Sequence, residues 1–168
     1  MGLVARTSWQ KMAGAATAVM VFSCLAMAQA TPSKKGPNPD EPIIRQYVLT
    51  MDNVRKYSEV AKKGEAAAKS DPAMAAEMNK VEAADVYNVQ KAEMMEKSPH
   101  IAAFLKSNGM TARDFVFIPM TAFTAALAIA AEDAKKQPPA FINPINTKFV
   151  RDHRDELEKL NLFASDGD

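Results

Sequence analysis

The chain has 168 residues, of which 21 are basic and 20 are acidic, so its formal net charge at pH 7 is +1. This balance lacks the positive field that would neutralise many phosphates, which argues against a nucleic-acid partner. The length suits one domain with one core, and the sequence shows no internal repeat.

The first thirty residues have the pattern of a secretory signal peptide. Arg6 and Lys11 precede a largely apolar, uncharged run over 12–27, and small residues follow in the steps that end at Ala28 and Ala30. A basic start, an apolar middle and a small-residue end are the three parts of a signal that is removed after export. We therefore expect a periplasmic or secreted protein, cleaved near Ala28 or Ala30.

Cys24, the only cysteine, lies in this apolar run and is expected to leave with it. The mature protein then forms no disulfide, which fits a bacterial periplasm better than a small eukaryotic secreted domain. Alternatively, Cys24 is the lipid-modified residue of a lipoprotein, since the small Ser23 precedes it, although Phe22 is bulkier than that pattern usually has. Signal removal takes away two basic residues and no acidic one, which brings the formal net charge to about −1.

Residues 31–42 contain four prolines and almost no apolar side chain, a composition typical of an extended linker outside any core. We expect the helical domain to span 43–163 and a disordered tail to cover 164–168. The segment 43–49 is apolar enough to dock on the domain, either as a strand-like entry or as the first turns of a helix.

Thr50 is placed as the N-cap of a helix whose apolar residues recur at helical spacing from Met51 onward. Gly64, which follows two lysines, predicts an end near residue 63. The strong helix-forming segment 65–69 leaves a longer helix, to about 69, as the alternative.

Two proline steps predict further helix starts. Asp-Pro at 71–72 puts a capping side chain before a proline at the first helical position, and the stretch that continues to Lys97 forms one long helix or two short ones. Ser-Pro at 98–99 repeats the signal, and Asn-Gly at 108–109 ends that helix.

Thr111 opens a predicted capping box with Asp114, and the seventeen residues 115–131 carry no charge. This run is at the short limit for crossing a bilayer, contains Pro119 and gains much of its length from weakly hydrophobic alanines. We therefore expect the central helix of a bundle, bent at Pro119, and no transmembrane span in the mature chain.

The prolines at 138–139 end this helix, and Asn143 or Asn146 caps a last one. The last helix is expected to be amphipathic, with an apolar face made of Ile145, Phe149, Val150, His153, Leu157 and Leu160. Together these elements predict an all-α, single-domain bundle of five or six helices with a buried, Ala- and Phe-rich central helix.

No catalytic motif is present. The mature chain has two histidines, no cysteine, and no H-E-x-x-H, G-x-S-x-G or phosphate-binding glycine loop, so we expect no catalytic residue and no metal site. His153 is expected at the core or its boundary, and His100, in a first helical turn, is expected to be exposed. Scattered carboxylates that converge in space into a hydrolase site are the remaining enzymatic alternative, because a single sequence does not reveal such convergence.

Three groups allow another interpretation. Met74 and Met78 are four residues apart and share a helix face, where thioethers bind Cu(I), although methionine more commonly fills gaps between helices. Met51 and His153 have the residue types that clamp haem in exported bundles. A recognition surface, or else a solvated helix face of ion pairs, is formed by Arg151, Asp152, Arg154, Asp155, Glu156 and Glu158.

Three segments, 47–52, 101–115 and 143–146, resemble a set of small exported bacterial proteins of unknown function. The matching motifs are helix caps and core positions, so the resemblance implies a shared fold and assigns no functional residue. The segment Leu-Thr-Met-Asp-Asn at 49–53 also resembles the Leu-Thr-x-x-Gln signature of periplasmic helical chaperones, with Asn53 in place of the glutamine.

These observations predict an exported, non-enzymatic helical protein without a cofactor. Its partner is expected to be a protein, an envelope component or a small apolar ligand, held between the Ala- and Met-rich helices and the Phe-rich core. The alternatives are a copper or haem carrier that uses Met and His ligands, and a chaperone-like periplasmic protein.

Overall fold

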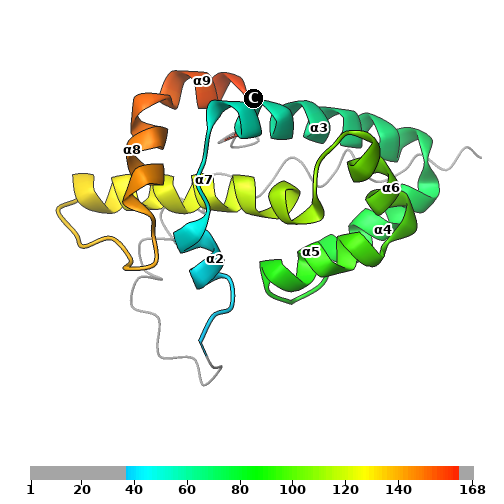
Figure 1. The fold of residues 1–168 in the computed structure, drawn as a ribbon, viewed down its shortest axis with the longest axis horizontal. Helices are drawn as coiled ribbons and strands as arrows, with labels where there is room; N and C mark the ends of the chain where they lie inside the picture. Colours follow the sequence, from blue (N-terminus) through cyan, green and yellow to red (C-terminus); the bar gives the residue numbers. More distant parts are fainter. Residues whose placement is uncertain (1–36, 163–168) are drawn as a thin grey trace, which may run out of the picture. The chain divides into compact units, whose positions relative to one another are not determined.

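The computed structural model describes residues 37–162. The predictions for the signal segment, for Cys24, for residues 31–36 of the linker and for the tail 164–168 lie outside the described residues. Within 37–162 every regular element is a helix, which confirms the all-α prediction (Figure 1). Eight helices are present in this range instead of five or six, because 41–46 is helical and the last predicted helix is divided at His153.

In chain order the helices are α2 Glu41–Gln46, α3 Met51–Ser70, α4 Pro72–Glu82, α5 Asn88–Lys97, α6 Pro99–Ser107, α7 Ala112–Asp133, α8 Pro144–Asp152 and α9 Arg154–Lys159. Helix α7 contacts α2, α3, α5 and α8, and α4 contacts α3, α5 and α6. In Figure 1, α3 and α7 lie with their axes roughly parallel but run in opposite directions, α8 crosses α7 near its carboxyl end, and α4, α5 and α6 gather toward the other end of α7.

Helix α3 starts as predicted. The Thr50 side chain accepts a hydrogen bond from the Asn53 amide at 3.2 Å, and the Asn53 side chain accepts one from the Thr50 amide at 3.0 Å. The longer alternative is correct, because α3 continues through Gly64 to Ser70. A Cβ at Gly64 would lie 3.4 Å from the Phe104 ring, so this glycine provides close packing instead of a helix end.

Helix α4 also starts as predicted, with the Asp71 carboxylate accepting from the amides of Ala73 and Met74. Of the two alternatives for 72–97, the structure has two helices, α4 and α5. Helix α6 begins at Pro99 and is followed by Gly109 at φ +62°, a left-handed conformation in which glycine is favoured.

Helix α7 is capped by Thr111, whose side chain accepts from the Asp114 amide at 3.0 Å. The Asp114 carboxylate accepts hydrogen bonds from the hydroxyls of Thr111 and Tyr47, both at 2.7 Å, so part of the predicted capping box is used to bind the chain before α3. By length and composition α7 could cross a membrane, and 39% of its most apolar stretch is buried inside the protein. The core helix of a soluble protein can have the same length and apolar composition.

Residues 37–50, which we call the N-terminal strap, form hydrogen bonds with helices that are distant in the sequence. Asp40 is 3% exposed, and its carboxylate accepts hydrogen bonds from the amides of Asn88 and Val89 and from the Asn88 side chain, each at 2.9 Å. This carboxylate therefore accepts hydrogen bonds from backbone amides in the first turn of α5, as a helix cap does. The predicted linker boundary at 42 is therefore wrong, because Asp40 is buried and α2 begins at Glu41.

Both alternatives for 43–49 hold in part, since residues 43–46 are helical and 47–49 are extended. Asn146, which is 1% exposed, accepts from the Leu49 amide at 2.9 Å and donates to the Tyr47 carbonyl at 2.7 Å. The cap of α8 is Asn143, which accepts from the Ile145 amide. The Asn146 side chain thus provides hydrogen-bond partners for backbone groups of the strap and does not cap a helix.

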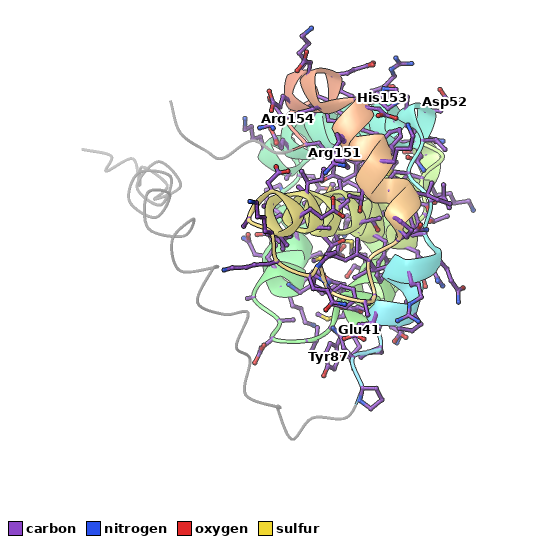
Figure 2. All side chains as sticks on the ribbon, turned by 90° about the vertical axis from the view of Figure 1, so that its left-hand side faces the viewer. Glu41, Asp52, Tyr87, Arg151, His153 and Arg154 are labelled. Atoms are coloured by element: carbon purple, nitrogen blue, oxygen red, sulfur yellow. The ribbon has the colours of Figure 1, made fainter. Side chains whose placement is uncertain are left out.

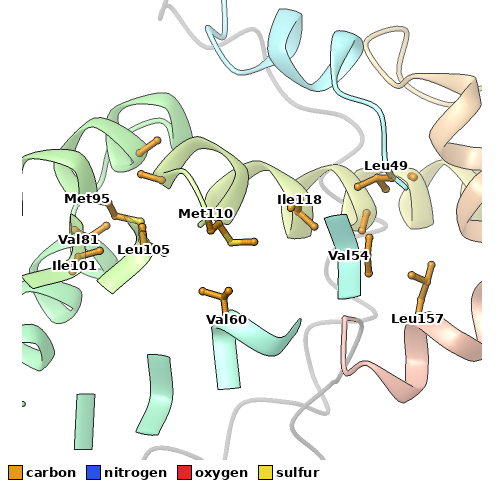
Figure 3. Close-up of a cluster of buried hydrophobic side chains, with 14 of the residues drawn as sticks. Leu49, Val54, Val60, Val81, Met95, Ile101, Leu105, Met110, Ile118 and Leu157 are labelled. Carbon is orange, nitrogen blue, oxygen red and sulfur yellow. The ribbon is translucent and has the colours of Figure 1, made fainter. Parts of the chain in front are cut away.

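The core runs the length of this helical unit (Figure 3). Val54 and Val60 from α3, Ile118 from α7 and Leu157 from α9 are at most 2% exposed. The last helix was predicted with Ile145 on its apolar face, and this is wrong, because Ile145 is 60% exposed. The chain divides at residue 153 into two helices, α8 and α9, with different directions. Leu157 of α9 is therefore buried in the core although α8 and α9 do not share one continuous apolar face.

Candidate binding cleft

A hollow in the helical unit lies between α7 and the α8–α9 pair. Its volume is about 440 Å³. The apolar part of its lining comes from Ala126, Ile129 and Ala130 on α7 and from Val150 on α8. We call this hollow the α7–α9 cleft.

Charged side chains surround the apolar part of the α7–α9 cleft: Asp133, Arg151, Arg154 and Glu158. The Arg151 guanidinium donates to Glu132 at 2.9 Å, and Arg154 Nε donates to Glu158 at 2.9 Å. Figure 2 shows Arg151, His153 and Arg154 together where α8 meets α9. The hydrogen bond to Glu158 raises the pKa of Arg154, so this guanidinium stays charged at the cleft.

A strip of apolar side chains on α7 adjoins this cleft. Phe123 is 52% exposed and Leu127 is 42% exposed, one turn apart on the same side of the helix. The half-buried Ala126 and the exposed Ala130 lie beside them and also line the cleft. We call Met120, Phe123, Ala126, Leu127 and Ala130 the α7 face; through its two alanines it is continuous with the cleft.

A smaller hollow of about 180 Å³ lies among α5, α6 and the start of α7, and it is lined by Glu96, Ala102, Leu105, Lys106, Met110, Thr111 and Ala112. The larger cleft is made by α7 with the two last helices. Sequence analysis missed it because its two walls are separated by the turn at 134–143 and share no local motif.

The methionines suggested as metal or haem ligands lie in the hydrophobic core or pack against it. Met74 is 3% exposed and belongs to the hydrophobic core, and Met51 and Met78 are half-buried against that core. The ring of His153 packs on Phe149 with 4.8 Å between centroids, at the core boundary as expected. Within 37–162 no three His, Cys, Asp or Glu side chains come together in a group suited to a metal ion.

His100 is exposed, as expected, and it has a partner that the sequence did not indicate. The Glu77 carboxylate of α4 accepts from the backbone amides of His100 and Ile101 at 3.0 and 3.1 Å, and His100 Nδ1 lies 2.8 Å from Glu77 Oε1. The side-chain hydrogen bond raises the pKa of His100 and lowers the pKa of Glu77. Glu77 thus supplies the cap that Ser98 does not, since the Ser98 hydroxyl donates to the Met94 carbonyl.

Tyr47 is the residue with the largest shift in pKa among those described. Burial raises the pKa of its phenol, and the hydrogen bond donated to Asp114 raises it further. The phenol therefore stays protonated and acts as a fixed donor between the strap and α7. This arrangement is a structural tie, because Asp114 is occupied by two hydroxyl donors.

The carboxylates at the cleft do not form a buried pair. Asp133 and Glu158 are both exposed, and Glu158 is bound to Arg154. A general acid needs an environment that keeps a carboxyl group protonated, and burial is the usual cause. What the cleft offers is an apolar floor with charges of both signs around it, which is suited to binding.

Comparisons with protein-family models, with curated proteins and with solved structures find no match to this chain. The functional inference therefore depends on the residues of this chain alone.

Proposed function

We propose that this chain is an exported, non-catalytic bacterial binding protein of the periplasm, and that it holds a small apolar ligand in the α7–α9 cleft. The observation that carries the proposal is the cleft itself, with Ala126, Ile129, Ala130 and Val150 facing a volume of about 440 Å³. Ligand sites typically have volumes of about 300–1,000 Å³, a mainly apolar lining and a few polar groups that orient the ligand.

Export is supported by the basic, apolar and small-residue parts of the first thirty residues. The absence of cysteine after residue 24 is compatible with a periplasmic domain that is stable without disulfides. Fractionation of expressing cells should place the processed chain in the periplasmic extract, and its mass should correspond to cleavage after Ala28 or Ala30. Retention of the intact chain in the cytoplasm would contradict this part of the proposal.

The bundle is proposed to be organised around α7. This is supported by the contacts of α7 with α2, α3, α5 and α8 and by Phe117, Ile118, Ala122 and Ala125, which are all 0% exposed. A helix in this position presents one side to the core and leaves the other to form the cleft wall.

Ligand binding is tested with an apolar fluorescent dye, phenylnaphthylamine, and a variant that fills the cleft. Ala130→Phe places a ring where the alanine lines the cleft, so dye fluorescence should fall to the level of free dye. The matched control is Ala103→Phe, the same substitution at an exposed alanine of α6 outside either hollow, and it should bind dye as the unmodified protein does. Equal binding by all three proteins would reject the cleft as the site.

The alternative is a carrier that binds copper through Met74 and Met78, or haem through Met51 and His153. Metal analysis and an absorption spectrum of protein purified from the periplasm separate it from the first proposal. Stoichiometric copper or a haem absorption band would favour the carrier, whereas a colourless protein that binds the dye would favour the apolar ligand.

A further inference from the structure

We infer that Asn108 is a site of spontaneous deamidation, and that opening of the turn between α6 and α7 controls the rate of this modification. Asn108 is the one asparagine of the sequence that is followed by glycine. Asparagine is among the thermolabile residue types, and a following glycine has no side chain to shield its amide nitrogen. The pair lies at the carboxyl end of α6, where Asn108 is half-buried and Gly109 is exposed.

The reaction consumes water and releases ammonia. The Gly109 amide nitrogen loses its proton to a base in the solvent and attacks Cγ of Asn108. A bond forms between this nitrogen and Cγ, the bond between Cγ and Nδ2 breaks, and Nδ2 takes up a proton and leaves as ammonia. Water then opens the cyclic imide at either carbonyl carbon, which yields aspartate or isoaspartate at position 108.

The backbone of Asn108 in the folded protein does not allow this ring to close. Its ψ of 6° places the Gly109 nitrogen nearly eclipsed with the Asn108 nitrogen, whereas the cyclic imide requires the Gly109 nitrogen on the side of Cβ. Because the peptide bond is planar, only rotation about the Cα–C bond, by roughly a third of a turn, brings the nitrogen to that side. This rotation moves Gly109 and the chain that follows it out of their present positions.

The nucleophile and the leaving group are also held by hydrogen bonds. The Gly109 amide donates to the Lys106 carbonyl at 3.0 Å. Asn108 Nδ2, which becomes the ammonia, donates to the Phe104 carbonyl at 2.9 Å. Both bonds must break before the imide forms, so the closed turn protects Asn108 from deamidation.

Contacts on either side of the pair keep the turn closed. The Met110 amide donates to the Leu105 carbonyl at 3.0 Å, a bond that commonly accompanies a glycine at a helix end. The Met110 side chain belongs to the buried core (Figure 3). The Lys56 ammonium group, on α3, donates to the Gly109 carbonyl. Lys56 therefore stabilises the closed turn from another helix.

Either product of the reaction disfavours the closed turn. Isoaspartate carries the main chain through its own side chain, and this additional backbone atom separates the Gly109 amide from the Lys106 carbonyl. Aspartate replaces the Nδ2 donor with a carboxylate beside the Phe104 carbonyl, at the helix end that disfavours negative charge. Deamidation therefore marks chains in which the turn has been open, and it opposes their return to the closed form.

Peptide mapping by mass spectrometry measures the modification directly. Trypsin cleaves after Lys106 and Arg113, and the peptide 107–113 contains Asn108 as its one amide side chain. The purified protein is incubated in mildly alkaline buffer with and without concentrated guanidinium chloride. The folded protein should deamidate at least about tenfold more slowly than the unfolded protein, because only molecules with an open turn react. Equal rates, or no modification of the unfolded protein, would overturn the inference.

Lys56→Met tests the contact from α3. The substitution removes the ammonium group and keeps an unbranched side chain, so the turn should open more often. Deamidation of the folded protein should become about two- to fivefold faster, which is the effect of one exposed charged contact. In guanidinium chloride the rate should equal that of the unmodified protein, since the contact is then absent.

Lys62→Met is the matched control, because it makes the same change at another exposed lysine of α3. It should leave both rates unchanged. Hydrogen exchange separates opening of the turn from a general loss of stability: in Lys56→Met the Gly109 and Met110 amides should exchange faster, and the amide of the buried Ala125 should not. A folded-state rate in Lys56→Met equal to that in Lys62→Met, or an equal acceleration of exchange at Ala125, would reject control by the turn.

Discussion

Asn146 links α8 to the strap through one buried side chain. Its carbonyl oxygen accepts from Leu49 and its amide donates to Tyr47, and Asn146 itself is 1% exposed. Asn146→Ala removes the acceptor of the buried Leu49 amide and leaves the partly buried Tyr47 carbonyl with only the 3.5 Å contact from the Asn143 side-chain amide. We expect a loss of about 1–3 kcal/mol in the free energy of unfolding, measured by urea denaturation. The control Asn79→Ala, at an exposed residue of α4, should change it by less than about 0.5 kcal/mol.

The contact between Glu77 and His100 predicts a pH-dependent stability. The pKa of Glu77 is lowered from 4.5, chiefly by the His100 hydrogen bond, so its contribution is present above pH 4.5 and is lost as the pH falls through the lowered value. The pKa of His100 is raised from 6.5 by the same bond, so its contribution is present below pH 6.5 and is lost as the pH rises through the raised value. The pair therefore stabilises most between pH 4.5 and 6.5.

The corresponding measurement is the melting temperature across pH 3 to 9, in steps of about one unit. The difference between the unmodified protein and Glu77→Gln should be largest near pH 5–6 and smaller on either side. Glu82→Gln removes an exposed carboxylate from the same helix and should give a flat difference. Parallel curves for Glu77→Gln and the unmodified protein would show that the contact with His100 adds nothing beyond the backbone hydrogen bonds.

At the scale of elements, the amides at the start of α5 bind the carboxylate of Asp40, which lies near the start of the described chain, 48 residues before Asn88. Asp40→Ala removes three acceptor contacts to Asn88 and Val89, and the amides of α5 lose a partner that is buried in the folded protein. We expect a loss of about 1–3 kcal/mol in stability, and hydrogen exchange at the first turn of α5 should accelerate more than in other helices. Asp85→Ala, at an exposed acid just before α5, should leave both quantities close to those of the unmodified protein.

The range of each hydrogen bond explains which elements were predictable. The caps at Thr50, Asp71, Thr111 and Asn143 all bind amides two or three residues away, so local sequence contains both partners. Asp40 and Asn88 are 48 residues apart, and Asn146 and Leu49 are 97 apart. Such pairs meet only after the fold has formed, which is why residues 37–42 of the strap were assigned to the linker.

The α7–α9 cleft is unpredictable for the same reason. Ala126 and Ala130 were recognised as part of an apolar helix, and Arg151 and Arg154 as part of a charged one, but their meeting depends on the angle at which α8 crosses α7. No proline or glycine occurs near His153, so the sequence contains no signal for the division of the last predicted helix. We attribute the division to tertiary packing, since Val150 and Leu157, on either side of it, are both buried in the same core.

For the whole molecule, the decisive question is whether protein or lipid surrounds α7. Two phenylalanines of this helix can be compared, because they lie in opposite environments: Phe117 is 0% exposed and Phe123 is 52% exposed. In a water-soluble bundle Phe117→Ala creates a cavity and should cost about 3–5 kcal/mol, measured by urea denaturation without detergent. Phe123→Ala removes a half-exposed ring and should cost less than about 1 kcal/mol. If α7 were a membrane span, both rings would lie in hydrocarbon or against neighbouring helices, the protein would need detergent for extraction, and this difference between the two variants would not be expected.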